Sequence, residues 1–273
     1  MASGKYQLLF YTKFTLTIEI KMSQNFANFP SLKKKTVFVT GGASGIGAEI
    51  VSAFAAQGSK VGFLDLDAPA SQNISNTLGE NVHFEVCDLR DITALKNAMS
   101  RLSERLGAAN ILVNNAANDD RHDWQDVTPD YWDERLSTNL RHQFFAIQHV
   151  ASGMIKAGGG SIINIGSNSW WEAGGGLPAY ATAKSAIHGL TRAMARDLGE
   201  HRIRVNTVVP GWIMTERQKD LWATPETLEA HQKRQCLPDL IDPVYVARMI
   251  LFLASDDASM CTANNYMVEA GSI

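Results

Sequence analysis

The sequence has few of the residues that build metal centres and disulfide frameworks. Its three cysteines, Cys87, Cys236 and Cys261, are widely spaced and form no CxxC pair. Its seven histidines show no HExxH spacing, which would bring two imidazoles to one metal ion. We therefore expect no disulfide, no metal site and a reducing, cytoplasmic setting.

Long apolar runs and clusters of one charge are also missing. No stretch reaches the roughly 18 consecutive apolar residues of a membrane-spanning helix. The net charge is −3, and Lys33 to Lys35 form a lone basic run, whereas nucleic-acid binding requires clustered Lys and Arg. The composition predicts a soluble protein that binds neither membrane nor nucleic acid.

The chain length suits one large domain. It has 273 residues, 45% of them hydrophobic, enough for a substantial buried core. The domain pattern begins near Ser31, so we predict a domain over residues 31–273 and an irregular extension over residues 1–30, with Met22 as an alternative start. Because Lys13 and Glu19 interrupt its apolar segment and no small-residue cleavage site follows, this extension does not read as a secretory signal.

Apolar, β-branched runs alternate with helical patterns along the chain. They cover residues 36–40, 61–65, 82–86, 111–115, 161–165 and 203–209. This is the spacing of repeated βαβ units. The runs are apolar at nearly every residue, as in a parallel sheet covered by helices on both faces. We therefore predict a single α/β domain with a doubly wound parallel sheet of the Rossmann type.

A glycine-rich turn follows the first predicted strand. The segment TGGASGIG spans residues 40–47 and leads into an apolar-periodic helix. Gly41, Gly45 and Gly47 carry no side chains, which would let the backbone approach a pyrophosphate at the helix N-terminus. A simple tight turn is the alternative, but the complete βαβ setting favours dinucleotide binding.

An acidic residue ends the second predicted strand. Asp65 lies 20 residues beyond Gly45, where a carboxylate can accept hydrogen bonds from both adenosine ribose hydroxyls. The neighbouring loop residues offer no cation for a 2′-phosphate, so NAD is favoured over NADP. Asp88, after the third strand, is either a cap on the adenine pocket or a turn aspartate.

Tyr180 and Lys184 lie four positions apart in AYATAKSAIHGL (179–190), which reads as a helix. Residues at this spacing are neighbours on a helix, so the ammonium of Lys184 can lower the pKa of Tyr180 and make it a general base. An ordinary surface pair is the alternative. Ser167, just past the fifth strand, and Asn139 add polar groups at the same edge of the sheet, which favours an active site.

With TGGASGIG, Ser167, Tyr180, Lys184 and PGWIMT (210–215) in this order, the chain resembles the short-chain dehydrogenase/reductase family from about Lys35 onward. The resemblance implies that Tyr180 transfers the proton, Ser167 binds the reacting oxygen, and Lys184 contacts the nicotinamide ribose. It also implies that Asn139 holds a relay water. The implied NAD contacts are Gly41, Ser44, Gly45, Ile46, Gly47, Asp65, Asp88, Leu89, Asn115, Ala116, Tyr180, Lys184, Pro210, Gly211, Ile213 and Thr215.

Two positions depart from the pattern of this family. Ala117 stands where a glycine usually closes the NNAG turn, and Ala263 stands where a glycine is expected after Thr262. Neither belongs to the set Asn139, Ser167, Tyr180 and Lys184.

The loop segments are similar to those of bacterial NAD-dependent aldose 1-dehydrogenases, notably at 114–124, 164–171 and 208–218. This likeness implies oxidation of an aldose at C1 to the aldonolactone, with D-xylose as the first candidate. The alternatives are L-arabinose, galactose, fucose, a non-sugar secondary alcohol, or a non-catalytic NAD-binding module. The candidate substrate contacts are Asn118, Asn168, Trp170 and Trp212.

The family resemblance also implies a homotetramer and a mobile lid. The tetramer would form through the helix at 140–155, the Tyr180 helix and a C-terminal strand, although apolar stripes on these helices could equally be core faces. The lid would cover residues 222–239, whose polar composition is compatible with it.

Overall fold

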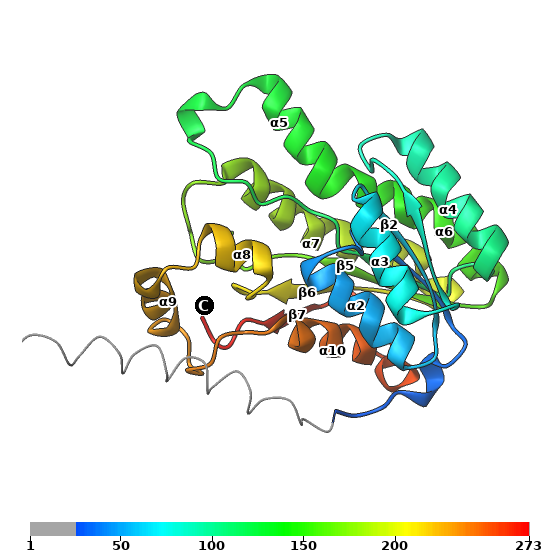
Figure 1. The fold of residues 1–273 in the computed structure, drawn as a ribbon. Helices are drawn as coiled ribbons and strands as arrows, with labels where there is room; N and C mark the ends of the chain where they lie inside the picture. The colour runs from blue at the N-terminus through cyan, green and yellow to red at the C-terminus, as the bar shows by residue number, and fades with distance from the viewer. Residues whose placement is uncertain (1–25, 273) are drawn as a thin grey trace, which may run out of the picture.

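A seven-stranded, all-parallel sheet forms the centre of the protein (Figure 1). The computed structural model describes residues 26–272. The strand order is β3-β2-β1-β4-β5-β6-β7, so the winding changes direction between β1 and β4. The strands are β1 (Thr36–Thr40), β2 (Lys60–Asp65), β3 (Val82–Val86), β4 (Ile111–Asn114), β5 (Gly160–Ile165), β6 (Ile203–Pro210) and β7 (Asn265–Val268). The predicted doubly wound, Rossmann-type single domain is confirmed.

Helices cover both faces of the sheet and bury a separate apolar core on each. One layer holds α2 (Gly45–Ala56), α3 (Ala68–Leu78) and α10 (Pro243–Ala254). The other holds α4 (Ile92–Leu106), α6 (His142–Lys156) and α7 (Pro178–Leu198). The remaining helical segments are η1 (Pro30–Leu32), η2 (Trp124–Asp126), α5 (Pro129–Leu136), the π-helix η3 (Ser137–Arg141), η4 (Gly199–His201), α8 (Glu216–Leu221), α9 (Pro225–Gln232) and η5 (Asp256–Ala258). Figure 1 shows α8 and α9 beside the end of β6.

The six apolar runs of the sequence correspond to β1–β6. The central strand β1 is buried along its whole length, as strands covered on both faces should be. The seventh strand, β7, was not among the runs because it has four residues and is only partly buried. Most of the predicted extension, residues 1–25 with Met22, lies outside the described residues, and its domain boundary stays a prediction. No helix within residues 26–272 is long and apolar enough to cross a bilayer.

A buried row of polar side chains fixes α7 against the sheet. Asn114 Nδ2 donates to Asn164 Oδ1 at 2.9 Å, and Asn164 Nδ2 donates to Thr191 Oγ1 at 2.9 Å. The Thr191 and Thr207 hydroxyls lie 2.7 Å apart. All four residues are fully buried, where an unpaired polar group would be costly. This row joins β4, β5 and β6 to the helix that carries Tyr180 and Lys184.

Candidate active site

A cavity of about 1440 Å³ lies at the carboxyl edge of the sheet and is lined by loops that follow the strands. This edge is where open parallel α/β sheets bind their ligands. The structure brings most of the predicted site residues to this one cavity. They are Gly41, Ser44, Gly45, Ile46, Gly47, Asp65, Asp88, Leu89, Asn115, Ala116, Asn118, Ser167, Asn168, Tyr180, Lys184, Pro210, Gly211, Trp212, Ile213 and Thr215.

The glycine turn is packed too closely for side chains. Gly41 has a φ of +67°, and a Cβ added to it would lie 2.8 Å from the Cα of Ala116. A Cβ on Gly47 would lie 1.7 Å from the carbonyl oxygen of Gly41, a severe overlap. Asn115 Nδ2 donates to that same oxygen at 2.8 Å. Two of the glycines are therefore required by close packing and backbone conformation as well as by any ligand.

The N-terminus of α2 fits an anionic ligand. Ser44 is its N-cap residue but makes no side-chain capping hydrogen bond, so the side chain leaves the first-turn N–H groups to other acceptors. Asp65 lies beside this turn, where its Oδ2 accepts from the N–H of Ala43 at 2.9 Å. The cradle therefore suits the pyrophosphate of a dinucleotide.

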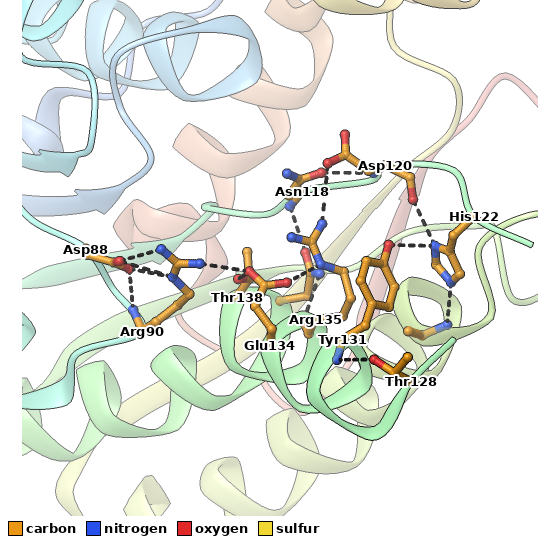
Figure 2. A network of polar contacts seen from close by, with 12 residues as sticks. Asp88, Arg90, Asn118, Asp120, His122, Thr128, Tyr131, Glu134, Arg135 and Thr138 are labelled. Atoms are coloured by element: carbon orange, nitrogen blue, oxygen red, sulfur yellow. Dashed lines mark hydrogen bonds and ion pairs between the residues drawn. The ribbon is translucent and has the colours of Figure 1, made fainter. Parts of the chain in front are cut away.

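Charged side chains form a chain along the α5 side of the cavity (Figure 2). Arg90 pairs with Asp88 at 2.6 Å and with Glu134 at 3.0 Å. Glu134 also bonds Arg135, whose Nη1 lies 3.5 Å from Asp120 Oδ2. The hydrogen bonds from Arg90 lower the pKa of Asp88. Asp88 is thus part of an ion pair, and Arg90 is a cation near the adenosine end that the sequence did not reveal.

Tyr180 lies in the first turn of α7 and lines the cavity beside Ser167. Burial raises the pKa of Tyr180 above its usual range, and the carboxylate of Asp119 raises it further. A hydrogen bond with Ser167 acts in the opposite direction. The phenol is therefore neutral at neutral pH in this structure.

Lys184 lies one turn further along α7, and its side chain is 1% exposed. Its Nζ donates to the carbonyl oxygen of Ile165 at 2.7 Å and is 5.6 Å from the ring centroid of Tyr180. Burial lowers the pKa of Lys184 to about 7, against a raising effect of Asp119. The predicted proximity of the two side chains is therefore observed. The pKa of Tyr180 shifts upward, opposite to the predicted fall, because burial is the largest influence on this phenol.

Asn139 lies within the π-helix η3 and is fully buried behind the cavity. Its Oδ1 accepts from the backbone N–H of Asn118 at 2.8 Å, and its Nδ2 donates to the carbonyl of Arg135 at 2.9 Å. Single turns of π-helix are frequent at functional sites. The side chain of Asn139 thereby anchors the loop after β4, which carries the candidate residue Asn118.

Trp170 lies outside the main cavity. Its indole stacks on Trp171 with ring centroids 3.8 Å apart, and its Nε1 lies 3.1 Å from His188 Nε2. It lines a separate depression over α7. Of the four candidate substrate residues, Asn118, Asn168 and Trp212 line the main cavity and Trp170 does not. The hydrogen bond to His188 holds the indole of Trp170 away from the main cavity.

The segment that follows β6 closes one side of the cavity through contacts that the sequence did not indicate. Arg217 Nη2 bonds Asp120 at 2.5 Å, and its Nε lies 3.5 Å from Asp119. Gln218 Nε2 donates to Asp119 at 2.7 Å, while its Oε1 accepts from Trp212 Nε1 at 2.8 Å. Asp119 and Asp120 lie about 100 positions before Arg217 and Gln218 in the chain, and no local pattern marks these pairs.

Comparisons with known proteins agree with this architecture. A family model described as enoyl-(acyl carrier protein) reductase matches residues 41–272. D-xylose 1-dehydrogenase of Caulobacter vibrioides is 48% identical over 248 residues, which is 90% of this chain and 98% of that protein. The chain belongs to the short-chain dehydrogenase/reductase family. A probable galactose dehydrogenase of Rhizobium meliloti is 44% identical, over 90% of this chain and 97% of its own length.

A solved member of the family has the same fold. The crystal structure of a variant of actinorhodin polyketide ketoreductase with NADPH superposes with a TM-score of 0.81 and 27% identity, over 88% of this chain and 97% of that one. Members of the short-chain dehydrogenase/reductase family are oxidoreductases that use a nicotinamide cofactor. No group of three or more metal-ligating side chains gathers anywhere in residues 26–272.

Proposed function

We propose that the protein is an NAD-dependent aldose 1-dehydrogenase, with D-xylose as its first candidate substrate. The observation that carries this proposal is the joint placement of Ser167, Tyr180 and Lys184 in one cavity with the glycine turn. The names of the 48% and 44% identical relatives, D-xylose 1-dehydrogenase and probable galactose dehydrogenase, support a sugar substrate. D-Galactose is accordingly the second candidate.

In this mechanism the protein orients the sugar and removes a proton. Bound NAD⁺ supplies the acceptor for the hydride that leaves C1. Ser167 donates a hydrogen bond to the anomeric oxygen. Tyr180 first releases its own proton to water, and the resulting phenolate takes the proton of the anomeric hydroxyl. Lys184, anchored on Ile165, stabilises this phenolate before the transfer. Because burial raises the pKa of Tyr180, we expect kcat/KM to rise with pH on the alkaline side.

The residues around the adenosine end support NAD over NADP. The carboxylate of Asp65 would repel a ribose 2′-phosphate and accept from a free 2′-hydroxyl. Arg90 is the cation at this end, but its guanidinium already bonds Asp88 and Glu134. We expect kcat/KM for NAD⁺ to exceed that for NADP⁺ by at least tenfold. Saturation curves with the two cofactors at fixed sugar concentration measure this ratio, and an equal or inverted ratio would contradict the assignment.

Replacing the proposed base tests the mechanism. Tyr180→Phe removes one hydroxyl, and we expect kcat to fall by about 10²–10⁴-fold, as for loss of general base catalysis. NADH binding, followed by fluorescence, should change little. Tyr266→Phe, on β7 away from the cavity, is the matched control and should keep wild-type turnover. Retained turnover in Tyr180→Phe would rule this mechanism out.

A panel of substrates tests the specificity. Initial rates with D-xylose, L-arabinose, D-galactose, L-fucose and a secondary alcohol should be highest for D-xylose. NADH binding without turnover of any of these compounds would instead support a non-catalytic dinucleotide-binding module.

A further inference from the structure

Glu172 is an acidic residue of the main cavity that the sequence did not single out. It lies in the loop between β5 and α7, five residues after Ser167, and its side chain is 16% exposed. A carboxylate that is largely removed from water must be hydrogen-bonded to be stable. The contacts of its two carboxylate oxygens therefore indicate whether Glu172 only stabilises the fold or can also bind a ligand.

One oxygen of Glu172 is fully engaged by the protein. Its Oε1 accepts from Asn168 Nδ2 at 2.6 Å and from Ser272 Oγ at 3.0 Å. Asn168 Nδ2 also lies 3.2 Å from Ser272 Oγ, so the three side chains form a closed triangle. The N–H of Ser272 bonds the carboxylate of Glu269, which fixes the C-terminal segment in place. The orientation of the Glu172 carboxylate is thereby set by segments about 100 residues apart.

The other oxygen has only a distant partner. Arg234 Nη1 lies 3.8 Å from Glu172 Oε2, which is beyond hydrogen-bonding distance. The Arg234 side chain is 55% exposed, and an ion pair of this kind contributes little to stability. An ionised carboxylate oxygen only accepts hydrogen bonds. Oε2 is thus a fixed acceptor at the wall of the cavity, with room for a donor from a ligand.

The surroundings of Glu172 connect it to the reacting centre. Asn168, which holds its Oε1, directly follows Ser167, and the N–H of Asn168 donates to the carbonyl of Pro210 at 3.1 Å. The indole of Trp212 lines the same cavity and packs edge-on against His231, with centroids 5.2 Å apart. An oriented acceptor and an aromatic ring together suit a ligand that has hydroxyl groups and a face of C–H bonds.

We propose that Glu172 determines substrate specificity by accepting a hydrogen bond from a hydroxyl group of the sugar other than the one that is oxidised. Asn168 and Ser272 are positioning residues that hold the carboxylate for this contact. This inference rests on the proposed sugar dehydrogenase function. It also predicts selection against ligands that carry a carboxylate or phosphate at the same place, because like charges repel there.

A charge-neutral substitution tests the role of the carboxylate. Glu172→Gln turns the acceptor into an amide of the same shape, and we expect KM for D-xylose to rise at least tenfold, with kcat within threefold of wild type and KM for NAD⁺ unchanged. The matched control is Glu229→Gln on α9, which removes an exposed carboxylate paired with Lys233 and should leave all three constants unchanged. An unchanged KM for D-xylose in Glu172→Gln would overturn the proposal.

Deoxy sugars identify the contact itself. With wild type, at least one of the 2-, 3- and 4-deoxy analogues of D-xylose should lose tenfold or more in kcat/KM relative to D-xylose. Glu172→Gln should lose less than threefold on the same analogue, because the hydrogen bond is already absent. Equal losses in both enzymes for every analogue would show that Glu172 is merely structural. Ser272→Ala provides a milder second variant, expected to raise KM about threefold, should Glu172→Gln fold poorly; an unchanged KM and an unchanged deoxy-sugar profile in this variant would then overturn the proposal.

Failure of this inference differs from failure of the proposed function. If wild type oxidises D-xylose and the Glu172 variant matches it, only the specificity role is overturned. If wild type oxidises no sugar at all, the proposed function and the inference that rests on it are overturned together.

Discussion

The two ends of the cavity are built in different ways. The phosphate cradle of the cofactor end uses backbone from one contiguous segment, the turn at 40–47, packed so closely that Gly47 cannot carry a Cβ. The substrate end uses side chains from several loops, held by contacts such as Arg217 with Asp119 and Glu172 with Ser272. The first is specified locally and tolerates little change. The second is assembled by the tertiary fold and can vary while the chemistry stays constant.

The largest effect should come from filling the closest backbone contact at the cofactor end. Gly47→Ala places a methyl group 1.7 Å from the carbonyl of Gly41, and we expect the unfolding free energy to fall by about 3 kcal/mol. NADH affinity should fall at least tenfold, as measured by fluorescence titration. Gly189→Ala is the matched control, because a Cβ there meets nothing within 4 Å. It lies inside α7, so this control should gain about 0.5–1 kcal/mol. Wild-type affinity in Gly47→Ala would contradict the packing argument.

His142, fully buried at the start of α6, should make the unfolding free energy depend on pH by about 2 kcal/mol. Burial, assisted by the charge of Lys184, lowers the pKa of His142 to about 3 from 6.5. Between these values the unfolded chain binds a proton that the folded protein excludes, so the unfolding free energy falls as the pH drops below 6.5. Urea unfolding of wild type at pH 7 and pH 5 should differ by about 2 kcal/mol more than that of His142→Gln. Parallel pH profiles would disprove this assignment.

A smaller effect should come from the substrate end, where Arg217 pairs with two aspartates. The side chains of Arg217 and Asp120 are about half exposed, and that of Asp119 is 24% exposed. Exposed ion pairs of this kind contribute about 0–1 kcal/mol to stability. Arg217→Gln should therefore raise KM for the sugar about threefold. In wild type KM should also rise with salt, because ions screen the pair. Lys219 on the same helix does not line the cavity, and Lys219→Gln, which breaks its exposed pair with Glu216, should change neither. If KM depends on salt equally in wild type and in Arg217→Gln, the salt dependence does not come from the pairs of Arg217.

The smallest effect, on the unfolding free energy, should come from Ala263, which lies outside both ends of the cavity. This residue has a φ of +61°, a conformation that favours glycine. Ala263→Gly should raise the unfolding free energy by about 0.5 kcal/mol, because relief of strain slightly exceeds the added entropy of the unfolded chain. Ala186→Gly, on the exposed face of α7, should lower it by about 1 kcal/mol. Thermal melts of the two variants compare these opposite signs, and equal losses would show that Ala263 is unstrained.

The sequence predicted features that depend on contiguous residues and missed those that depend on packing. The strands, the glycine turn and the spacing of Tyr180 and Lys184 can be read directly from local patterns. The placement of Glu172 and Arg217 could not, because Ser272, which holds Glu172, and the two aspartates that pair with Arg217 are about 100 residues away. Spacing also could not show that burial raises the pKa of Tyr180. The outward turn of Trp170 depends on His188, which no sequence pattern marks as its partner.

The carboxylate of Asp65 has a consequence for any redesign of cofactor preference. Because its Oδ2 accepts from Ala43 and its Oδ1 accepts from the N–H of Asp67, this side chain also braces two loops. Exchanging it for alanine to admit a phosphorylated ribose would loosen both loops at once. A serine or asparagine at this position, combined with a new arginine in place of the exposed Leu66, would retain an acceptor for the scaffold while reversing the local charge.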